Sequence, residues 1–125
     1  MTRGVTMAII CDGKGRFLMG KRKDTGKWTC AGGHLEKGEL PLEGLAREVK
    51  EETGLDIKKA DLVTIKYDGD VTGYVFKCEI YGEIDFSKDP DEEFSEMKYV
   101  DIWEVRNNLH FPWSKNWLAE YWRDN

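Results

Sequence analysis

The sequence predicts an α/β fold in which helices cover both faces of a mixed β-sheet. Runs of β-branched and alternating apolar residues recur along the chain, as expected of strands, and amphipathic segments with helical spacing interrupt them. This mixture of strands with two or three helices favours helices packed against a central sheet. With 125 residues the chain suits one domain, and we expect that domain to cover residues 1–125.

Strands are expected in both halves of the chain. Residues 5–11 and 17–20 are apolar runs on either side of the turn-forming residues 12–15, and this arrangement predicts a β-hairpin. Further strands are expected at residues 28–31, 62–67, 74–84 and 97–102. A helical turn is expected at residues 103–109 and a last helix at residues 115–123, capped by Ser114.

The main helix is expected between Pro41 and Gly54. Proline suits the first helical turn, where no N–H is needed, and glycine suits the position just past the end. The residues expected to face the core are Leu42, Leu45, Ala46 and Val49. Three carboxylates, Glu48, Glu51 and Glu52, would then lie toward one side of the helix, largely away from this apolar stripe.

Carboxylates gather around the start of this helix as well. Glu36 and Glu39 precede it, and the Gly32-Gly33 pair, expected to form a turn, lets the backbone approach a ligand closely. One interpretation is a solvated acidic surface, since glutamate is a strong helix former. The other is a metal site, because clustered carboxylates repel one another unless a hard cation neutralises them. Oxygen ligands suit Mg²⁺ or Mn²⁺.

Residues 33–55 resemble the Nudix box, G-x5-E-x7-R-E-U-x-E-E-x-G-U, in which U is aliphatic. The positions that match are Gly33, Glu39, Arg47, Glu48, Val49, Glu51, Glu52, Gly54 and Leu55. The resemblance to this MutT-like hydrolase family implies an α/β/α sandwich around a mixed β-sheet. It also implies an enzyme that hydrolyses a nucleoside diphosphate linked to a further group X, by attack of water on phosphorus with Mg²⁺ or Mn²⁺ bound.

The resemblance also implies roles for individual residues. The implied metal ligands are Gly33, through its carbonyl, and Glu48, Glu51 and Glu52. Arg47 would orient a glutamate, Glu51 would be a further ligand or a base, and Glu39 would be a supporting carboxylate near the substrate. Several family members use a further glutamate from a loop before a late strand. Here Glu93 has the most similar spacing, and Glu96 is the alternative. The implied catalytic residues are therefore Arg47, Glu48, Glu51 and Glu93.

The substrate expected is a purine nucleoside triphosphate, cleaved to the monophosphate and pyrophosphate. The proline typical of ADP-ribose hydrolases and the signature of NADH hydrolases are absent. Residues 111–116 resemble the F-P-x-x-N end of MutT-type enzymes, with one extra residue. Asn116 would then read a purine edge while Phe111 or Trp113 stacks on the base, although core packing is the alternative. ADP-ribose, a dinucleoside polyphosphate, 5′-capped RNA and a non-catalytic nucleotide-binding module are the other candidates.

Composition limits the partners and the compartment. A net charge of −5 argues against broad binding to nucleic acid, and no apolar run reaches the length of a membrane span. Three cysteines, Cys11, Cys30 and Cys78, form no C-x-x-C pair, so we expect buried free thiols. These features favour a cytoplasmic enzyme, either a monomer or a homodimer, with a nucleotide as its substrate.

Overall fold

The computed structural model describes residues 3–110; residues 1–2 and 111–125 lie outside the described part. The last helix expected at 115–123 and the tail residues Phe111, Trp113 and Asn116 therefore fall outside it. The described elements are β1 (Arg3–Ile9), β2 (Arg16–Arg22), β3 (Trp28–Thr29), β4 (Gly32–His34), α1 (Pro41–Thr53), β5 (Asp56–Asp68), β6 (Val71–Tyr81), β7 (Phe94–Asp101) and α2 (Ile102–Val105).

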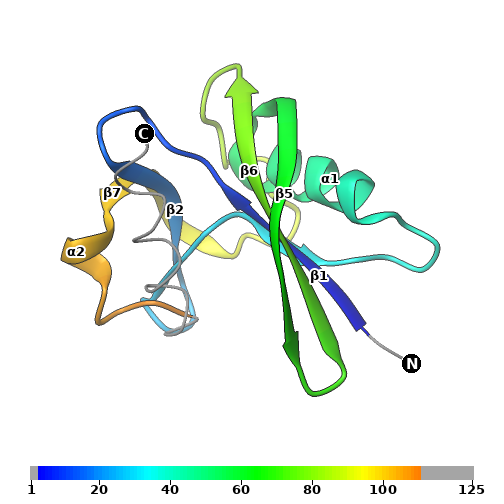
Figure 1. The fold of residues 1–125 in the computed structure, drawn as a ribbon. Helices are drawn as coiled ribbons and strands as arrows, with labels where there is room; N and C mark the ends of the chain where they lie inside the picture. The colour runs from blue at the N-terminus through cyan, green and yellow to red at the C-terminus, as the bar shows by residue number, and fades with distance from the viewer. Residues whose placement is uncertain (1–2, 111–125) are drawn as a thin grey trace.

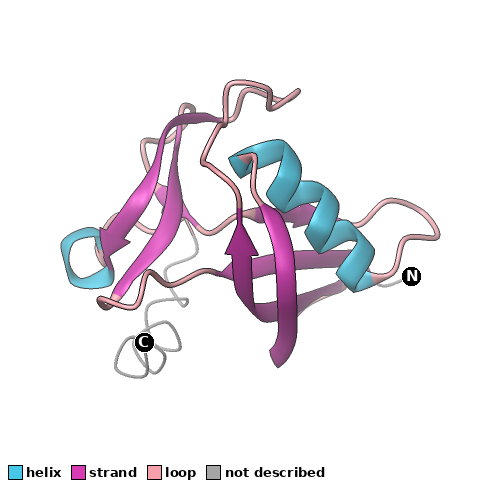
Figure 2. Cartoon of the chain, turned by 90° about the horizontal axis from the view of Figure 1, so that it is seen from above, coloured by secondary structure: helices cyan, strands magenta, loops and turns pink. Residues whose placement is uncertain are grey.

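The strands form two sheets, and α1 covers one face of the larger sheet (Figures 1 and 2). The larger sheet has the order β4-β1-β6-β5, and the smaller has the order β3-β2-β7. Strands β1 and β6 run parallel while the other pairs run antiparallel, so the larger sheet is mixed. The predicted α/β class is confirmed, with the strands divided between two sheets and not joined in one.

The prediction that the first two strands pair as a hairpin holds at the turn but is wrong for the strands themselves. The Leu18 N–H donates to the Ile10 carbonyl at 2.8 Å, and Cys11 forms an isolated bridge with Phe17. Past this turn β1 pairs in the larger sheet and β2 in the smaller one. The reason is burial on both sides: Phe17, Leu18 and Met19 are all at most 1% exposed, so β2 needs cover on both faces.

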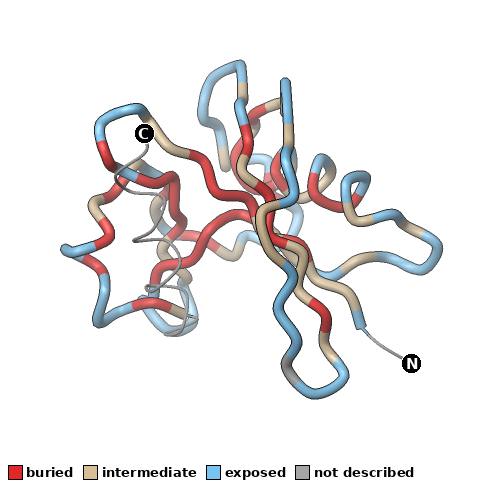
Figure 3. Tube along the Cα trace, viewed as in Figure 1, coloured by how far each residue is buried: buried red, intermediate tan, exposed pale blue. Residues whose placement is uncertain are grey.

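Two apolar clusters fill the space on either side of the larger sheet. Figure 3 shows that the buried residues are concentrated along the central strands. Ile9 belongs to the cluster between the two sheets, whereas Ala8 packs beneath α1 with Leu45 and Val49. Neighbouring residues of β1 therefore serve opposite faces, as the strand period requires. In the described residues no disulfide forms: Cys30 and Cys78 are buried free thiols, as predicted, and Cys11 is half-buried. No helix of the described part is long and apolar enough to cross a membrane.

Helix α1 begins and ends where predicted, but its buried face is rotated. It starts at Pro41, and Gly54 ends it in the left-handed conformation with φ 79°. The expected core residue Leu42 is 50% exposed, and Ala46 is also exposed, so both predictions are wrong. The helix instead buries Gly44, because a Cβ there would lie 2.3 Å from a Leu35 methyl group. This close approach turns Gly44, Leu45, Val49, Glu52 and Thr53 inward.

Outer strand β5 is long and irregular. Its pairing with β6 shifts register between Ile57 and Lys59 and again between Leu62 and Thr64. It continues to the turn at Asp68, where the chain reverses into β6, as predicted. Figure 1 shows β5 and β6 as two long strands joined by a tight turn, and β6 pairs with β1 along the whole length of β1.

The Gly32-Gly33 pair belongs to a strand and not to the predicted turn. Both residues pair antiparallel with β1, opposite Met7 and Thr6. Gly32 has φ +153°, and a Cβ built on it would lie 2.0 Å from the Thr6 carbonyl oxygen. Only glycine fits here, because the obstructing atom belongs to the backbone of the adjacent strand.

Replacing Gly32 by Ala should therefore lower the free energy of unfolding by at least about 3 kcal/mol, as β1 and β4 separate. Urea denaturation followed by circular dichroism measures this loss. Gly13→Ala is the matched control, because its φ is also positive but nothing lies within 4 Å of the added Cβ. We expect the control to lose only about 1 kcal/mol. Equal losses in the two variants would contradict the steric argument.

Candidate active site

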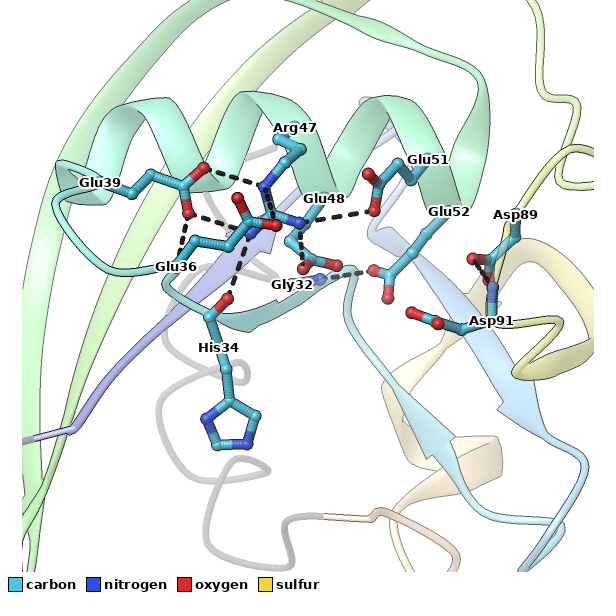
Figure 4. A network of polar contacts seen from close by, with 10 residues as sticks. All are labelled: Gly32, His34, Glu36, Glu39, Arg47, Glu48, Glu51, Glu52, Asp89 and Asp91. Carbon is cyan, nitrogen blue, oxygen red and sulfur yellow. Dashed lines mark hydrogen bonds and ion pairs between the residues drawn. The ribbon is translucent and has the colours of Figure 1, made fainter.

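The guanidinium group of Arg47 joins α1 to the preceding loop (Figure 4). Its Nε and Nη2 atoms donate to the two carboxylate oxygens of Glu39, each at 2.9 Å. Nη1 donates to Glu48 at 2.8 Å and lies 3.5 Å from Glu51. Nη2 also donates to the His34 carbonyl at 3.2 Å. One arginine thus holds carboxylates from the loop and from two turns of α1, together with the end of β4.

Glu39 serves as the anchor for Arg47. The hydrogen bonds from Arg47 lower the pKa of Glu39 to about 2, so it remains a carboxylate. Both of its oxygens are occupied, and one also accepts the Glu36 N–H at 2.9 Å. The paired Glu39–Arg47 geometry is a bidentate contact that fixes the plane of the guanidinium group. Glu39 therefore contacts Arg47, and Arg47 in turn contacts Glu48.

Glu52 lies at the centre of the acidic group and is buried, contrary to the expected position away from the apolar stripe. Its side chain is 2% exposed, and Oε1 accepts the Gly32 N–H at 2.8 Å. Burial raises its pKa to about 9, and the negative charges of Glu48, Glu93 and Asp89 act in the same direction. The Gly44–Leu35 contact that rotates the helix is what turns this carboxylate inward.

Gly33 leaves room for the Glu48 carboxylate. A Cβ at position 33 would lie 2.8 Å from the Glu48 carboxyl carbon, so any side chain would displace that group. Burial raises the pKa of Glu48, and the hydrogen bond from Arg47 opposes this effect. A glycine backbone and two inward carboxylates, Glu48 and Glu52, therefore meet at β4.

The acidic loop before β7 reaches the same place. Glu93 faces the cleft, and burial and the charge of Asp89 raise its pKa. Glu96, the alternative, lies in β7, forms an ion pair with Lys98 at 3.4 Å and is not among the residues that line the cleft. Asp89 and Asp91 also belong to the acidic group (Figure 4), and sequence reasoning missed both. The only signal for them was the density of carboxylates in this loop.

A cleft of about 630 Å³ runs from these carboxylates between the two sheets. Its acidic side includes Glu36, Glu48, Asp91 and Glu93. On the other side Arg22 donates to both oxygens of Asp24, at 2.9 and 2.8 Å. Apolar residues of both sheets form much of the remaining lining: Val5, Met7, Cys30, Val71, Val75 and Phe94. A cleft of this size and mixed polarity suits a small-molecule ligand.

The donor set of this site fits a hard divalent cation. Asp89 is 5% exposed, and its Oδ2 has no hydrogen-bond partner among the described residues. Glu52 is likewise buried among like charges. Within residues 3–110 no three acidic, His or Cys side chains are grouped closely enough to hold a metal ion. Arg47 contacts one oxygen of Glu48 and one of Glu51, which leaves the second oxygen of each carboxylate for a cation.

Comparison with known proteins gives consistent results. The family model described as "NUDIX domain" matches residues 1–121. A MutT-like protein of Streptomyces ambofaciens is 39% identical over 80 residues, which are 62% of this chain and 51% of that protein. The human 8-oxo-dGDP phosphatase NUDT18 is 31% identical over 113 residues, 86% of this chain and 34% of that protein. The chain spans about half or less of the length of the curated relatives it matches.

Solved structures share the fold over almost the whole chain. The MutT protein of Bacillus halodurans superimposes with a TM-score of 0.76 at 25% identity, covering 96% of this chain and 82% of that chain. A NUDIX hydrolase of Nitrosomonas europaea gives a TM-score of 0.81 at 21% identity, covering 99% and 90%. An ADP-ribose pyrophosphatase of Streptococcus suis gives 0.80 at 23% identity, covering 99% and 92%. Because the NUDIX hydrolase and the ADP-ribose pyrophosphatase are 21% and 23% identical to this chain, their similarity concerns the fold alone.

Burial of Glu52 predicts how the stability of the metal-free protein depends on pH. Its folded pKa of about 9 lies above the ordinary glutamate value of 4.5, so between these values the unfolded chain releases a proton that the folded chain keeps. Stability should therefore fall as pH rises through this window. Glu52→Gln removes the titration, and in excess chelator it should be more stable than wild type by on the order of 2 kcal/mol near about pH 8.

Denaturation in chelator near about pH 6 and about pH 8 measures this difference. Glu83→Gln, at an exposed position, is the control and should follow wild type. Equal pH dependence in wild type and Glu52→Gln would show that Glu52 is not a buried, protonated group.

Proposed function

We propose that this chain, which belongs to the Nudix family and is a pyrophosphohydrolase-family enzyme, hydrolyses the pyrophosphate bond of a nucleotide with the aid of Mg²⁺ or Mn²⁺. The observation that carries the proposal is the half-buried Glu48 beside the buried Glu52 at the glycine strand β4, held next to Arg47 at the end of a cleft. Family members are typically divalent-metal dependent. The cation, the substrate and the individual roles below are proposals.

The proposed chemistry assigns a task to each part of the site. Glu48 and Glu52 would hold the divalent cation, with Glu51 and the Gly33 carbonyl as further ligands. When bound, the cation supplies neutralisation of the phosphate charge and activation of a water molecule. Glu93, whose pKa is raised by burial and by Asp89, is the proposed base outside the helix. Arg47 keeps Glu48 oriented and does not contact the substrate.

The proposed substrate is a purine nucleoside triphosphate, or its damaged form, giving the monophosphate and pyrophosphate. Support comes from the MutT-like and 8-oxo-dGDP phosphatase relatives, which match 62% and 86% of this chain. The tail residues Phe111, Trp113 and Asn116, proposed to contact the base, lie outside the described residues. ADP-ribose is the main competing substrate.

A panel of nucleotides tests this function. With Mg²⁺, wild type should release pyrophosphate and a monophosphate from purine triphosphates faster than it cleaves ADP-ribose or a dinucleoside polyphosphate. Glu52→Gln should lower kcat at least about a hundredfold, because a charged ligand is lost while the shape is kept. Glu83→Gln should keep full activity, and chelator should abolish the activity of all three proteins. Equal turnover by wild type and Glu52→Gln on every nucleotide would refute the metal assignment.

Arg47→Lys separates orientation from substrate binding. Lysine keeps the charge but cannot make the paired contact with Glu39 while also reaching Glu48. We therefore expect kcat to fall roughly ten- to hundredfold with little change in KM. Steady-state kinetics on the best substrate of the panel measure both constants. A large rise in KM at constant kcat would instead indicate that Arg47 binds phosphate.

A further inference from the structure

The pairing between β2 and β7 is irregular next to the acidic loop before β7. Its register shifts between Lys21 and Arg22, so Ser95 is an extra residue in β7. The Ser95 hydroxyl donates to the Lys21 carbonyl at 3.4 Å. An extra residue of this kind is a β-bulge, and bulges are common beside active sites, where they redirect a side chain. This bulge lies two residues after Glu93.

The bulge explains how Phe94 enters the apolar cluster beneath α1. In a regular strand, residues three positions apart face opposite sides of the sheet. Phe94 and Met97 are three positions apart, yet both belong to the cluster that contains Leu45 and Val49 of α1. The extra residue Ser95 removes this contradiction. The bulge is therefore what buries the Phe94 side chain, which is 4% exposed.

Gly20 of β2 provides the space for the Phe94 ring. A Cβ built on Gly20 would lie 2.5 Å from Cδ1 of this ring and 2.8 Å from its Cγ. The φ of Gly20 is not positive, so its backbone conformation does not require glycine. The ring is packed in the core, where a displaced group moves its neighbours as well. Phe94 seated on Gly20 is therefore a fixed point at the start of β7.

Glu93 directly precedes this fixed point and is held by the backbone as well. The Lys23 N–H donates to the Glu93 carbonyl at 2.8 Å. The Glu93 side chain faces the cleft, and the Glu52 side chain hydrogen-bonds to it. Carboxyl groups this close repel each other when both are charged, and other carboxylates of the loop add like charge. Holding Glu93 at this place therefore requires an anchor.

We propose that the bulge in β7 and the Phe94 ring seated on Gly20 form a positioning element that holds the Glu93 carboxyl group in the cleft. The kinetic consequence rests on the proposed function, in which Glu93 is the base. Gly20 is not among the residues that line the cleft, so a change there reaches the reaction through Phe94 and Glu93.

Gly20→Ala tests the element, because the added Cβ overlaps the Phe94 ring. On the best nucleotide of the panel we expect kcat to fall about tenfold, with KM changed less than about twofold. Glu93→Gln should lower kcat at least about a hundredfold. The double variant should be no slower than Glu93→Gln alone, because misplacing a base has no effect once the base is gone. Losses that multiply in the double variant would overturn the proposal.

Amide hydrogen exchange of Lys23 measures the anchor without turnover. This amide exchanges when it separates from the Glu93 carbonyl. In Gly20→Ala we expect its exchange, followed by NMR, to be at least about tenfold faster than in wild type. The Leu18 amide, which donates to the Ile10 carbonyl at 2.8 Å from the same strand, is the internal reference and should not change.

A second variant and a matched control complete the test. Phe94→Leu keeps an apolar residue in the core but removes the ring, so it tests the element even if Gly20→Ala does not fold. It should also accelerate the exchange of the Lys23 amide. Gly73→Ala is the control, because Gly73 is a strand glycine without a positive φ whose added Cβ would lie 3.5 Å or more from its neighbours. It should leave the exchange of Lys23 unchanged.

Unchanged exchange of Lys23 in folded Gly20→Ala and Phe94→Leu proteins would also overturn the proposal. Failure of the proposed function is distinguishable from this outcome. A protein that hydrolyses no nucleotide, but whose Lys23 amide exchanges faster in both variants, would retain the positioning element and lose the hydrolase assignment.

Discussion

The burial of an acidic side chain beside a glycine strand is the constraint on which the site depends. Glu52 is almost inaccessible to solvent, and its carboxyl group accepts the Gly32 N–H. A buried carboxylate among like charges is costly, so neighbouring groups must compensate. The positive charge of Arg47 offsets the negative charges of Glu48 and Glu51, and the ion pair with Glu39 holds Arg47 in place. Removing the glycines would eliminate the space in which these carboxylates meet.

Much of the fold and the position of the site could be predicted from local patterns. Pro41 and Gly54 mark the ends of α1 because each residue suits one end of a helix for a backbone reason. The division into two sheets could not be predicted, because adjacent strands joined by a turn normally pair. It becomes understandable only when the burial of Phe17, Leu18 and Met19 on both faces is known.

The inward face of α1 shows why helical periodicity alone was insufficient. The spacing of Leu42 and Ala46 fits an apolar stripe, yet both residues are exposed. A single close contact between Gly44 and Leu35 determines the rotation of the helix, and contacts between distant residues leave no periodic signal. The same rotation buries Glu52, so the acidity of the site was predictable from the sequence and its burial was not. The burial of Asp89 likewise depends on how the loop before β7 folds back onto the site.

The irregular outer strand β5 also affects how the molecule meets copies of itself. A straight strand edge with unpaired N–H and C=O groups can template the addition of another chain. In β5 the two register shifts break that edge into short lengths, and the exposed side chains of Lys58 and Lys66 place positive charge along it. Among the described residues the larger sheet ends at β5, and an edge interrupted in this way is a poor template for another strand.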